Sequence, residues 1–307
     1  MFPSPKEFDE YLAQLENLNL SEETAEKKVY DLFNKLLTLP ITAYSLPADF
    51  PTTRARINYN GDRFKQKEEV WYKPDEYNTG YGRANNTELN VFYGAIDPYP
   101  ANNDINKPIE RMTALCEISD IYFSEPKETT TETVTFSRWY LGKELLLACP
   151  FDFSKLSSES PILSDLDKAF KKTVKENQDY KEQINRFHTF ISEEFSKHPI
   201  DDEHEYKITA LFTEMMIKSK FDGIIYPSVK TEKVGFNIAI PSQTVKDNFQ
   251  LFAVAECTHY RKEDYSTLNN DLLAIEIDDD GFFELSPGHP YKLTEKEILQ
   301  DIEENTS

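Results

Sequence analysis

A loop rich in glycine and asparagine runs directly into a short apolar segment, and this part of the sequence is well suited to holding a ligand. Gly80 and Gly82 permit a close backbone approach, and Asn85 favours a turn. Arg83 carries a planar guanidinium whose five N–H donors match a phosphate or a carboxylate. Residues 91–93 then predict a short buried strand. The alternative is a surface loop whose arginine makes a solvated ion pair.

Other residues of chemically useful type lie elsewhere in the chain. Arg54 and Arg56 fall in a strand-like stretch, and Glu117 lies on a predicted helix at 109–118. Ser228 follows Pro227, which predicts the end of a strand. Taken singly, each residue has an ordinary structural explanation: a surface ion pair, a solvated helix carboxylate or a turn hydroxyl.

Several common functional sites are excluded by their missing motifs. Neither the dinucleotide-binding Gly-x-Gly-x-x-Gly nor the P-loop pattern occurs, and Ser228 lacks the Gly-x-Ser-x-Gly of a hydrolase elbow. The five histidines show no paired metal spacing, and the acidic run 278–281 lacks the alternation of a calcium loop. The sequence therefore predicts no metal site.

Composition limits the partners. A chain of 307 residues with 39% hydrophobic content can bury a large core. Its 34 basic residues stand against 55 acidic ones, and a net charge of −21 argues against nucleic acid and anionic membranes. An anionic small molecule remains possible where arginines gather locally, as they do before residue 90: Arg54, Arg56, Arg63 and Arg83.

Cysteine usage and hydropathy predict a cytoplasmic protein. Cys116, Cys149 and Cys257 are widely spaced in apolar settings, which is typical of buried thiols in a reducing compartment. The sequence has no run of eighteen apolar residues, and acidic residues at its start are unlike a signal peptide.

The first part of the chain predicts a helical extension over residues 1–46. Ser4 to Glu7 has the pattern of a capping box and begins one helix, and Ser21 begins a second. Pro40, Pro47 and Pro51 then impose an extended passage, where we place a boundary.

The rest of the chain mixes strands and helices in irregular order, which predicts an α+β fold. We divide it into residues 47–258, with a helical insertion at about 160–200 whose two helices break around Asn177, and a C-terminal β-hairpin and acidic tail over 259–307. The expected elements are strands at 54–58, 91–93, 224–229, 236–240 and 251–257, hairpins at 133–141/144–150 and 272–277/282–285, and helices at 109–118, 203–220 and from 294.

Five fragments in a fixed order resemble the RES domain, named for its Arg, Glu and Ser. They are Arg54, Gly82-Arg83-x-Asn85 with Tyr93, Glu117, Tyr226-Pro227-Ser228 and Gly235-Phe236-Asn237, and they span roughly residues 50–242. The resemblance implies an ADP-ribosyltransferase-like mixed β core that uses NAD as substrate, without metal or other cofactor. Several members are toxins of bacterial toxin–antitoxin pairs that hydrolyse or phosphorolyse NAD, so an antitoxin protein is an implied partner.

Carried over position by position, the resemblance implies catalytic roles for Glu117, Arg54 and Ser228. Its implied substrate-binding residues are Arg83, Tyr93, Asn85 and Gly82, with Arg56 competing with Arg54 for the first arginine position. The chain departs from the family at Ala84 and Asn86, where tryptophan and proline are usual, and in an enlarged span between Glu117 and Ser228.

The chemistry of these residue types fits cleavage of the bond between nicotinamide and ribose. That reaction develops positive charge on the sugar, and a carboxylate such as Glu117 stabilises this charge in the transition state. Two arginines can hold the pyrophosphate. Two alternatives stay open: a protein ADP-ribosyltransferase of the same fold, and a non-catalytic module that binds NAD or another ligand.

Overall fold

A computed structural model describes residues 2–99, 109–152, 160–198, 200, 202–232, 234–287 and 293–306. Within these residues the chain forms one mixed sheet in the order β1-β5-β6-β7-β3-β2-β4-β8-β9, with only β5 and β6 parallel. Its strands are β1 (Ala43–Leu46), β2 (Pro51–Ile57), β3 (Val91–Ile96), β4 (Thr130–Leu141), β5 (Leu145–Ala148), β6 (Gly223–Pro227), β7 (Phe236–Pro241), β8 (Phe249–Lys262) and β9 (Tyr265–Ala274).

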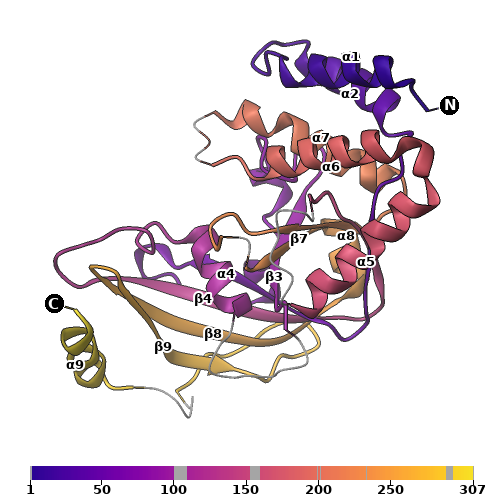
Figure 1. The fold of residues 1–307 in the computed structure, drawn as a ribbon. Helices are drawn as coiled ribbons and strands as arrows, with labels where there is room; N and C mark the ends of the chain where they lie inside the picture. The colour runs from indigo at the N-terminus through magenta and orange to yellow at the C-terminus, as the bar shows by residue number, and fades with distance from the viewer. Residues whose placement is uncertain are drawn as a thin grey trace.

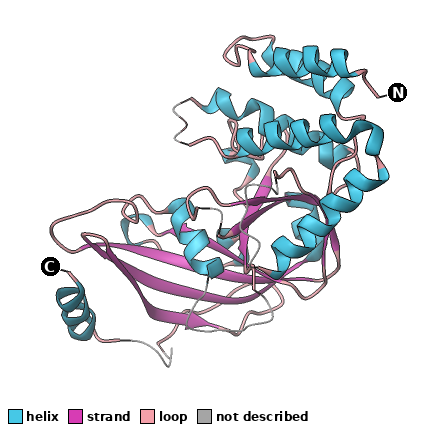
Figure 2. Ribbon diagram, in the orientation of Figure 1, coloured by secondary structure: helices cyan, strands magenta, loops and turns pink. Residues whose placement is uncertain are grey.

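The helices gather mainly at one end of this sheet, and the last helix lies by itself at the other end (Figure 2). Helices α1 and α2 lie over α6 and α7, while α4 packs on β2 and β3 (Figure 1). Their bounds are α1 (Pro5–Glu16), α2 (Ala25–Leu36), α3 (Lys67–Val70), α4 (Ile109–Ile118), α5 (Pro161–Glu176), α6 (Lys181–Phe195), α7 (Lys207–Lys218), α8 (Ser242–Asn248) and α9 (Glu295–Asn305). The expected α+β class is confirmed.

Local capping signals place several helix ends where the sequence predicts them. Ser4 and Glu7 form the reciprocal capping box of α1, and Thr294 caps α9 in the same way. Helix α5 ends at Glu176 with Asn177 as its C-cap, and α6 begins at Lys181, so the predicted break into two helices is confirmed. The second helix is predicted from Ser21 but begins at Ala25.

The predicted hairpin across Gly142 and Lys143 is wrong. Strand β4 pairs with β2 on one side and with β8 on the other, so neither of its edges is free for β5. Strand β5 instead pairs with β1 and β6 in the other half of the sheet. The chain leaves β4 at Gly142, whose N–H donates to the carbonyl oxygen of Asn248 at 2.6 Å.

The C-terminal hairpin differs from the prediction in its position. The long strands β8 and β9 pair from Val254↔Ala274 to Lys262↔Tyr265 and turn at Glu263, a residue with φ of 51°. The predicted turn at Asp280-Gly281 exists, with Gly281 at φ of 84°, but only single bridges such as Ile277↔Phe283 flank it. Strand β8 is also longer than the predicted 251–257.

The apolar core is continuous from the first two helices to the sheet. Phe8 of α1 and Phe33 of α2 belong to the same cluster of buried residues as Phe92 of β3. Strand β1, the end of the stretch interpreted as an extension, pairs with β5 along four residues. The three cysteines are buried, unpaired thiols, and no described helix is long and apolar enough to cross a membrane.

The sheet divides at its centre between β2 and β3. Strand β2 pairs with β4 along seven residues, and β3 pairs with β7 along six. Between β2 and β3 the pairing is confined to Thr52↔Ile96 and Thr53↔Ala95. The two strands diverge beyond these pairs, so the polar groups that follow Thr53 on β2 are available for other contacts.

Candidate functional site

A cavity of about 470 Å³ lies where β2 and β3 diverge. This volume falls within the range of small-molecule sites, roughly 300–1,000 Å³. Its wall is formed by strands β2, β3, β6 and β7, by helix α4 and by the loop that contains Gly82 and Arg83, called here the Gly-Arg loop. The polar side chains in the wall include Arg54, Arg83, Tyr93, Glu117, His198, Tyr206, Tyr226, Lys230 and Asn237.

Glu117 lies in the last turn of α4 and is held through one carboxylate oxygen. Ser228 Oγ and Asn237 Nδ2 each donate a hydrogen bond to its Oε1 at 2.7 Å. Among the described residues, Oε2 accepts no hydrogen bond. A carboxylate at a helix C-terminus faces the negative end of the helix dipole. Glu117 therefore does not lie here to stabilise its own helix.

Ser228 and Asn237 are themselves fixed by the sheet. Ser228 is fully buried directly after β6, and its N–H donates to the carbonyl oxygen of Gly235 at 2.9 Å. Asn237 lies on β7 opposite Tyr226 of β6 and is 5% exposed. The predicted serine at a strand end thus contacts the predicted glutamate, although 111 residues separate them.

Arg54 bridges the gap between the diverging strands with its side chain. Its Nη1 donates to the carbonyl oxygen of Tyr93 at 3.0 Å, and its guanidinium lies 5.6 Å from the ring centre of Phe92. Burial, with a smaller contribution from Arg56, lowers the pKa of Arg54 to about 10, so the group stays charged at neutral pH. Its Nε is buried and has no hydrogen-bond partner among the described residues. A buried donor of this kind is costly to leave unsatisfied.

Arg56 shares the strand with Arg54 but does not line this cavity. Its Nη1 donates to the carbonyl oxygen of Glu69, and its guanidinium lies over the ring of Phe64 at 4.8 Å. The structure therefore places Arg54, rather than Arg56, at the cavity. Alternation along a strand could not separate the two, because residues two apart point to the same face.

Arg83 lines the cavity while it also closes the end of helix α6. Its Nη1 and Nη2 donate to the carbonyl oxygens of Phe195 and Lys197, and its guanidinium lies over the ring of Tyr206. Carbonyl groups at a helix C-terminus attract a cation. The predicted helical insertion thus contributes directly to the wall around Arg83.

The Gly-Arg loop is held by its own polar groups. The Tyr93 hydroxyl donates to Asn85 Oδ1 at 2.8 Å and accepts from the N–H of Ala84 at 2.9 Å. A Cβ atom on Gly82 would lie 2.3 Å from Asn85 Oδ1, so a side chain there would displace this contact. Gly82 and Asn85, predicted to bind substrate, do not line the main cavity but fix the loop.

The two departures from the family pattern both lie in the interior. Ala84 is fully buried in the main core. Asn86 Nδ2 donates to Glu214 Oε2 at 2.7 Å, while its Oδ1 accepts from the N–H groups of Glu88 and Leu89. Both residues therefore tie the loop to its surroundings.

Sequence reasoning missed several residues of the cavity wall. Tyr226 and Asn237 belong to the quoted fragments and could have been included on that basis. His198 and Tyr206 come from the end of the helical insertion and the turn after it, and no local pattern marks them. Lys230 donates to the carbonyl oxygen of Glu117 at 3.2 Å.

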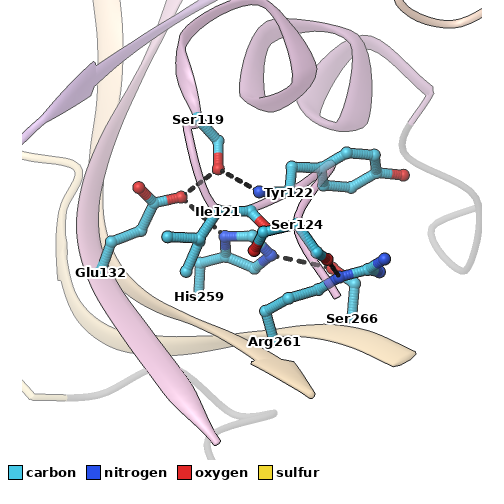
Figure 3. Close-up of polar contacts among 8 residues, drawn as sticks. All are labelled: Ser119, Ile121, Tyr122, Ser124, Glu132, His259, Arg261 and Ser266. Carbon is cyan, nitrogen blue, oxygen red and sulfur yellow. Dashed lines mark hydrogen bonds and ion pairs between the residues drawn. The ribbon is translucent and has the colours of Figure 1, made fainter. Parts of the chain in front are cut away.

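A buried polar network fixes the chain directly after Glu117. Ser119 donates its hydroxyl to Glu132 Oε1 and accepts from the N–H of Tyr122 at 3.0 Å. Figure 3 shows His259 between Glu132 and Ser266, with its ring nitrogens 2.8 Å from Glu132 Oε1 and from Ser266 Oγ. His259 is fully buried. Ser266, His259 and Glu132 are thus arranged in the order of a serine hydrolase triad. Because His259 is fully buried, we assign this network a structural role, which is to anchor the end of α4.

No group of three or more His, Cys, Asp or Glu side chains suited to a metal ion occurs in the described part of the chain. Comparison of the sequence with models of protein families and with curated proteins finds no match.

Proposed function

We propose that this protein cleaves NAD at the bond between nicotinamide and ribose and passes ADP-ribose to water or phosphate. The observation that carries the proposal is the shared cavity: a carboxylate held by two donors and two guanidinium groups line the same space. These residues come from distant parts of the chain, and the fold brings them to one cavity.

Glu117 is the group that we assign to the reacting sugar. Its Oε1 is fixed by Ser228 and Asn237, which leaves Oε2 for charge that develops in the cavity. Loss of nicotinamide leaves positive charge on the ribose carbon and ring oxygen, and a fixed carboxylate stabilises that charge more than the neutral ground state. Ser228 and Asn237 then act as positioning residues.

Arg54 and Arg83 are the groups that we assign to the pyrophosphate. Arg54 is half-buried and charged, and its buried Nε has no hydrogen-bond partner among the described residues, so a phosphate oxygen could satisfy it. Arg83 uses two of its five donors on backbone carbonyls and retains the others. Without metal or other cofactor, binding and electrostatics from these residues supply the catalysis.

The biological setting that we propose rests on the RES resemblance. It comprises a bacterial toxin of ADP-ribosyltransferase-like fold, acting in the cytoplasm and paired with an antitoxin protein. The three unpaired thiols agree with a reducing compartment.

The proposal is tested by incubating purified protein with NAD and measuring free nicotinamide, with and without phosphate. Release of nicotinamide together with ADP-ribose supports hydrolysis, and a phosphate-dependent rate supports phosphorolysis. Transfer of ADP-ribose to lysate proteins, detected by mass spectrometry, would instead favour a protein ADP-ribosyltransferase. NAD binding without turnover would favour a non-catalytic module.

A further inference from the structure

A second cavity of about 280 Å³ adjoins the main one. The two share Arg54 and Tyr93, so these side chains form the wall between them. The rest of the second cavity is lined by the connector between α3 and β3, including Lys73 and Thr79, and by Glu203. None of these three residues belongs to the fragments that resemble the RES domain.

The asparagines of the second cavity are held rigidly. Asn78 Nδ2 donates to the carbonyl oxygen of Asn86 at 2.7 Å, and its Oδ1 accepts from Asn85 Nδ2 at 2.9 Å. Asn90 Nδ2 donates to Asp75 Oδ1 at 2.8 Å. A floor whose polar groups are fixed in advance loses little entropy when a ligand binds.

Other polar groups around this cavity are not engaged. Within the described residues, the ammonium of Lys73, the hydroxyl of Thr79 and the carboxylate of Glu203 have no hydrogen bond or ion pair. The carboxylate lies against Gly80, since a Cβ there would meet Glu203 Oε2 at 2.3 Å. Arg54 lines both cavities, and its buried Nε has no hydrogen-bond partner among the described residues. This set of groups is suited to a ligand with several polar atoms.

Size argues against an independent ligand. About 280 Å³ lies just below the usual range of small-molecule pockets, roughly 300–1,000 Å³. Because the main cavity lies directly across Arg54, one elongated molecule could occupy both, with its charged centre at the guanidinium. A dinucleotide has this shape, with a diphosphate between two nucleosides.

We infer that the second cavity receives the adenosine of NAD, with Glu203 accepting hydrogen bonds from the ribose hydroxyls. This inference rests on the proposed function, which assigns the nicotinamide end to Glu117 in the main cavity. A carboxylate is an acceptor without donors and is the group that commonly binds an adenosine ribose in dinucleotide sites. Arg54 then contacts the diphosphate at the shared wall.

The test measures the binding of ADP and of nicotinamide mononucleotide by calorimetry. Glu203→Ala should weaken ADP binding about ten-fold, the usual effect of losing one hydrogen bond to a charged group. Nicotinamide mononucleotide, which lacks adenosine, should bind as it does to the unaltered protein. Glu205→Ala is the matched control, because it removes the same charge from the same short helix (Glu203–Tyr206) without lining the cavity.

The outcomes separate this inference from the proposed reaction. Unchanged ADP affinity in Glu203→Ala overturns the inference, and so does an equal loss in Glu205→Ala. If the protein releases nicotinamide from NAD but Glu203→Ala leaves the KM for NAD unaltered, the reaction stands and the adenosine site does not. If NAD is not cleaved but ADP affinity falls selectively in Glu203→Ala, the adenosine site stands and the reaction does not.

Discussion

Replacing Glu117 by glutamine changes one charge and almost nothing else. In the unaltered protein, Ser228 Oγ and Asn237 Nδ2 each lie 2.7 Å from Glu117 Oε1. The amide oxygen of glutamine can accept the same two hydrogen bonds. The amide nitrogen then takes the place of Oε2. Glu117→Gln therefore preserves shape and contacts and removes the negative charge on the cavity wall.

The effect on catalysis should be much larger than the effect on folding. Loss of one group that stabilises transition-state charge costs about 10²–10³ in rate, or about 2.7–4 kcal/mol. A hydrogen bond to a neutral acceptor contributes roughly 1 kcal/mol less than one to a charged acceptor. With two such bonds weakened at a half-buried side chain, we expect a loss of about 1–2 kcal/mol in the free energy of unfolding.

The assay follows nicotinamide release from NAD, with NAD affinity and thermal unfolding measured on the same samples. Glu110→Gln is the control, because Glu110 is buried on the same helix and does not line the cavity. The expected result is a loss of about 10²–10³ in turnover for Glu117→Gln only. A folded Glu117→Gln variant with near-normal turnover would refute the assignment of Glu117 as the catalytic carboxylate.

Four other changes test separate parts of the structure. Arg54→Lys should raise the KM for NAD about ten-fold, because a point charge cannot reproduce the guanidinium fork, while Arg56→Ala should leave it nearly unchanged; the reverse order would refute the placement. Asn237→Ala should lower kcat about ten-fold with little change in KM, because Glu117 loses one of the two hydrogen bonds that position it; a kcat equal to that of the unaltered protein would show that this hydrogen bond is not needed. Deleting residues 1–46 should lower the free energy of unfolding without changing turnover per folded molecule, since none of them lines the cavity; a folded truncation that binds NAD but cannot cleave it would contradict this. Unfolding followed against pH should show His188→Gln losing less stability than the unaltered protein as pH falls from about 6.5 to about 4.

The sign of the His188 effect follows from its surroundings. Burial lowers the pKa of His188 to about 4, below the ordinary 6.5. Its Nδ1 lies 2.9 Å from the carbonyl oxygen of Ile184, so Nδ1 carries the proton and Nε2 faces the N–H of Thr42. Between the two pKa values only the unfolded histidine takes up a proton, which costs the folded protein up to about 3 kcal/mol at the lower pH. Parallel pH profiles for the two proteins would contradict this.

Local signals predicted elements well because their causes lie within a few residues. The capping box at Ser4 and the break at Asn177 depend on contacts three or four positions apart. The false hairpin at Gly142 shows the limit of such signals. A turn between two apolar stretches indicates that the chain reverses, but it does not show that β2 and β8 occupy both edges of β4, so that β5 must pair elsewhere.

The candidate site was predictable as a set of residues but not as an arrangement. Order along the chain selected Arg54, Glu117 and Ser228, and the structure brings all three to one region through β2, α4 and β6. Their geometry depends on pairing across the whole sheet. The anchoring of Arg83 on helix α6 could not be foreseen, because it depends on how an irregular helical insertion packs.

The divided sheet explains why one arginine can serve both the fold and the site. Strand β2 stops pairing with β3 after Thr53, so the carbonyl oxygen of Tyr93 needs another donor in the interior. Arg54, which lines both cavities, supplies that donor from its side chain, and its buried Nε has no hydrogen-bond partner among the described residues. The single ammonium of a lysine could bind the carbonyl oxygen or a ligand, whereas the guanidinium has several donors and can bind both. The end of the β2–β3 pairing therefore creates the opening and places a charged group inside it.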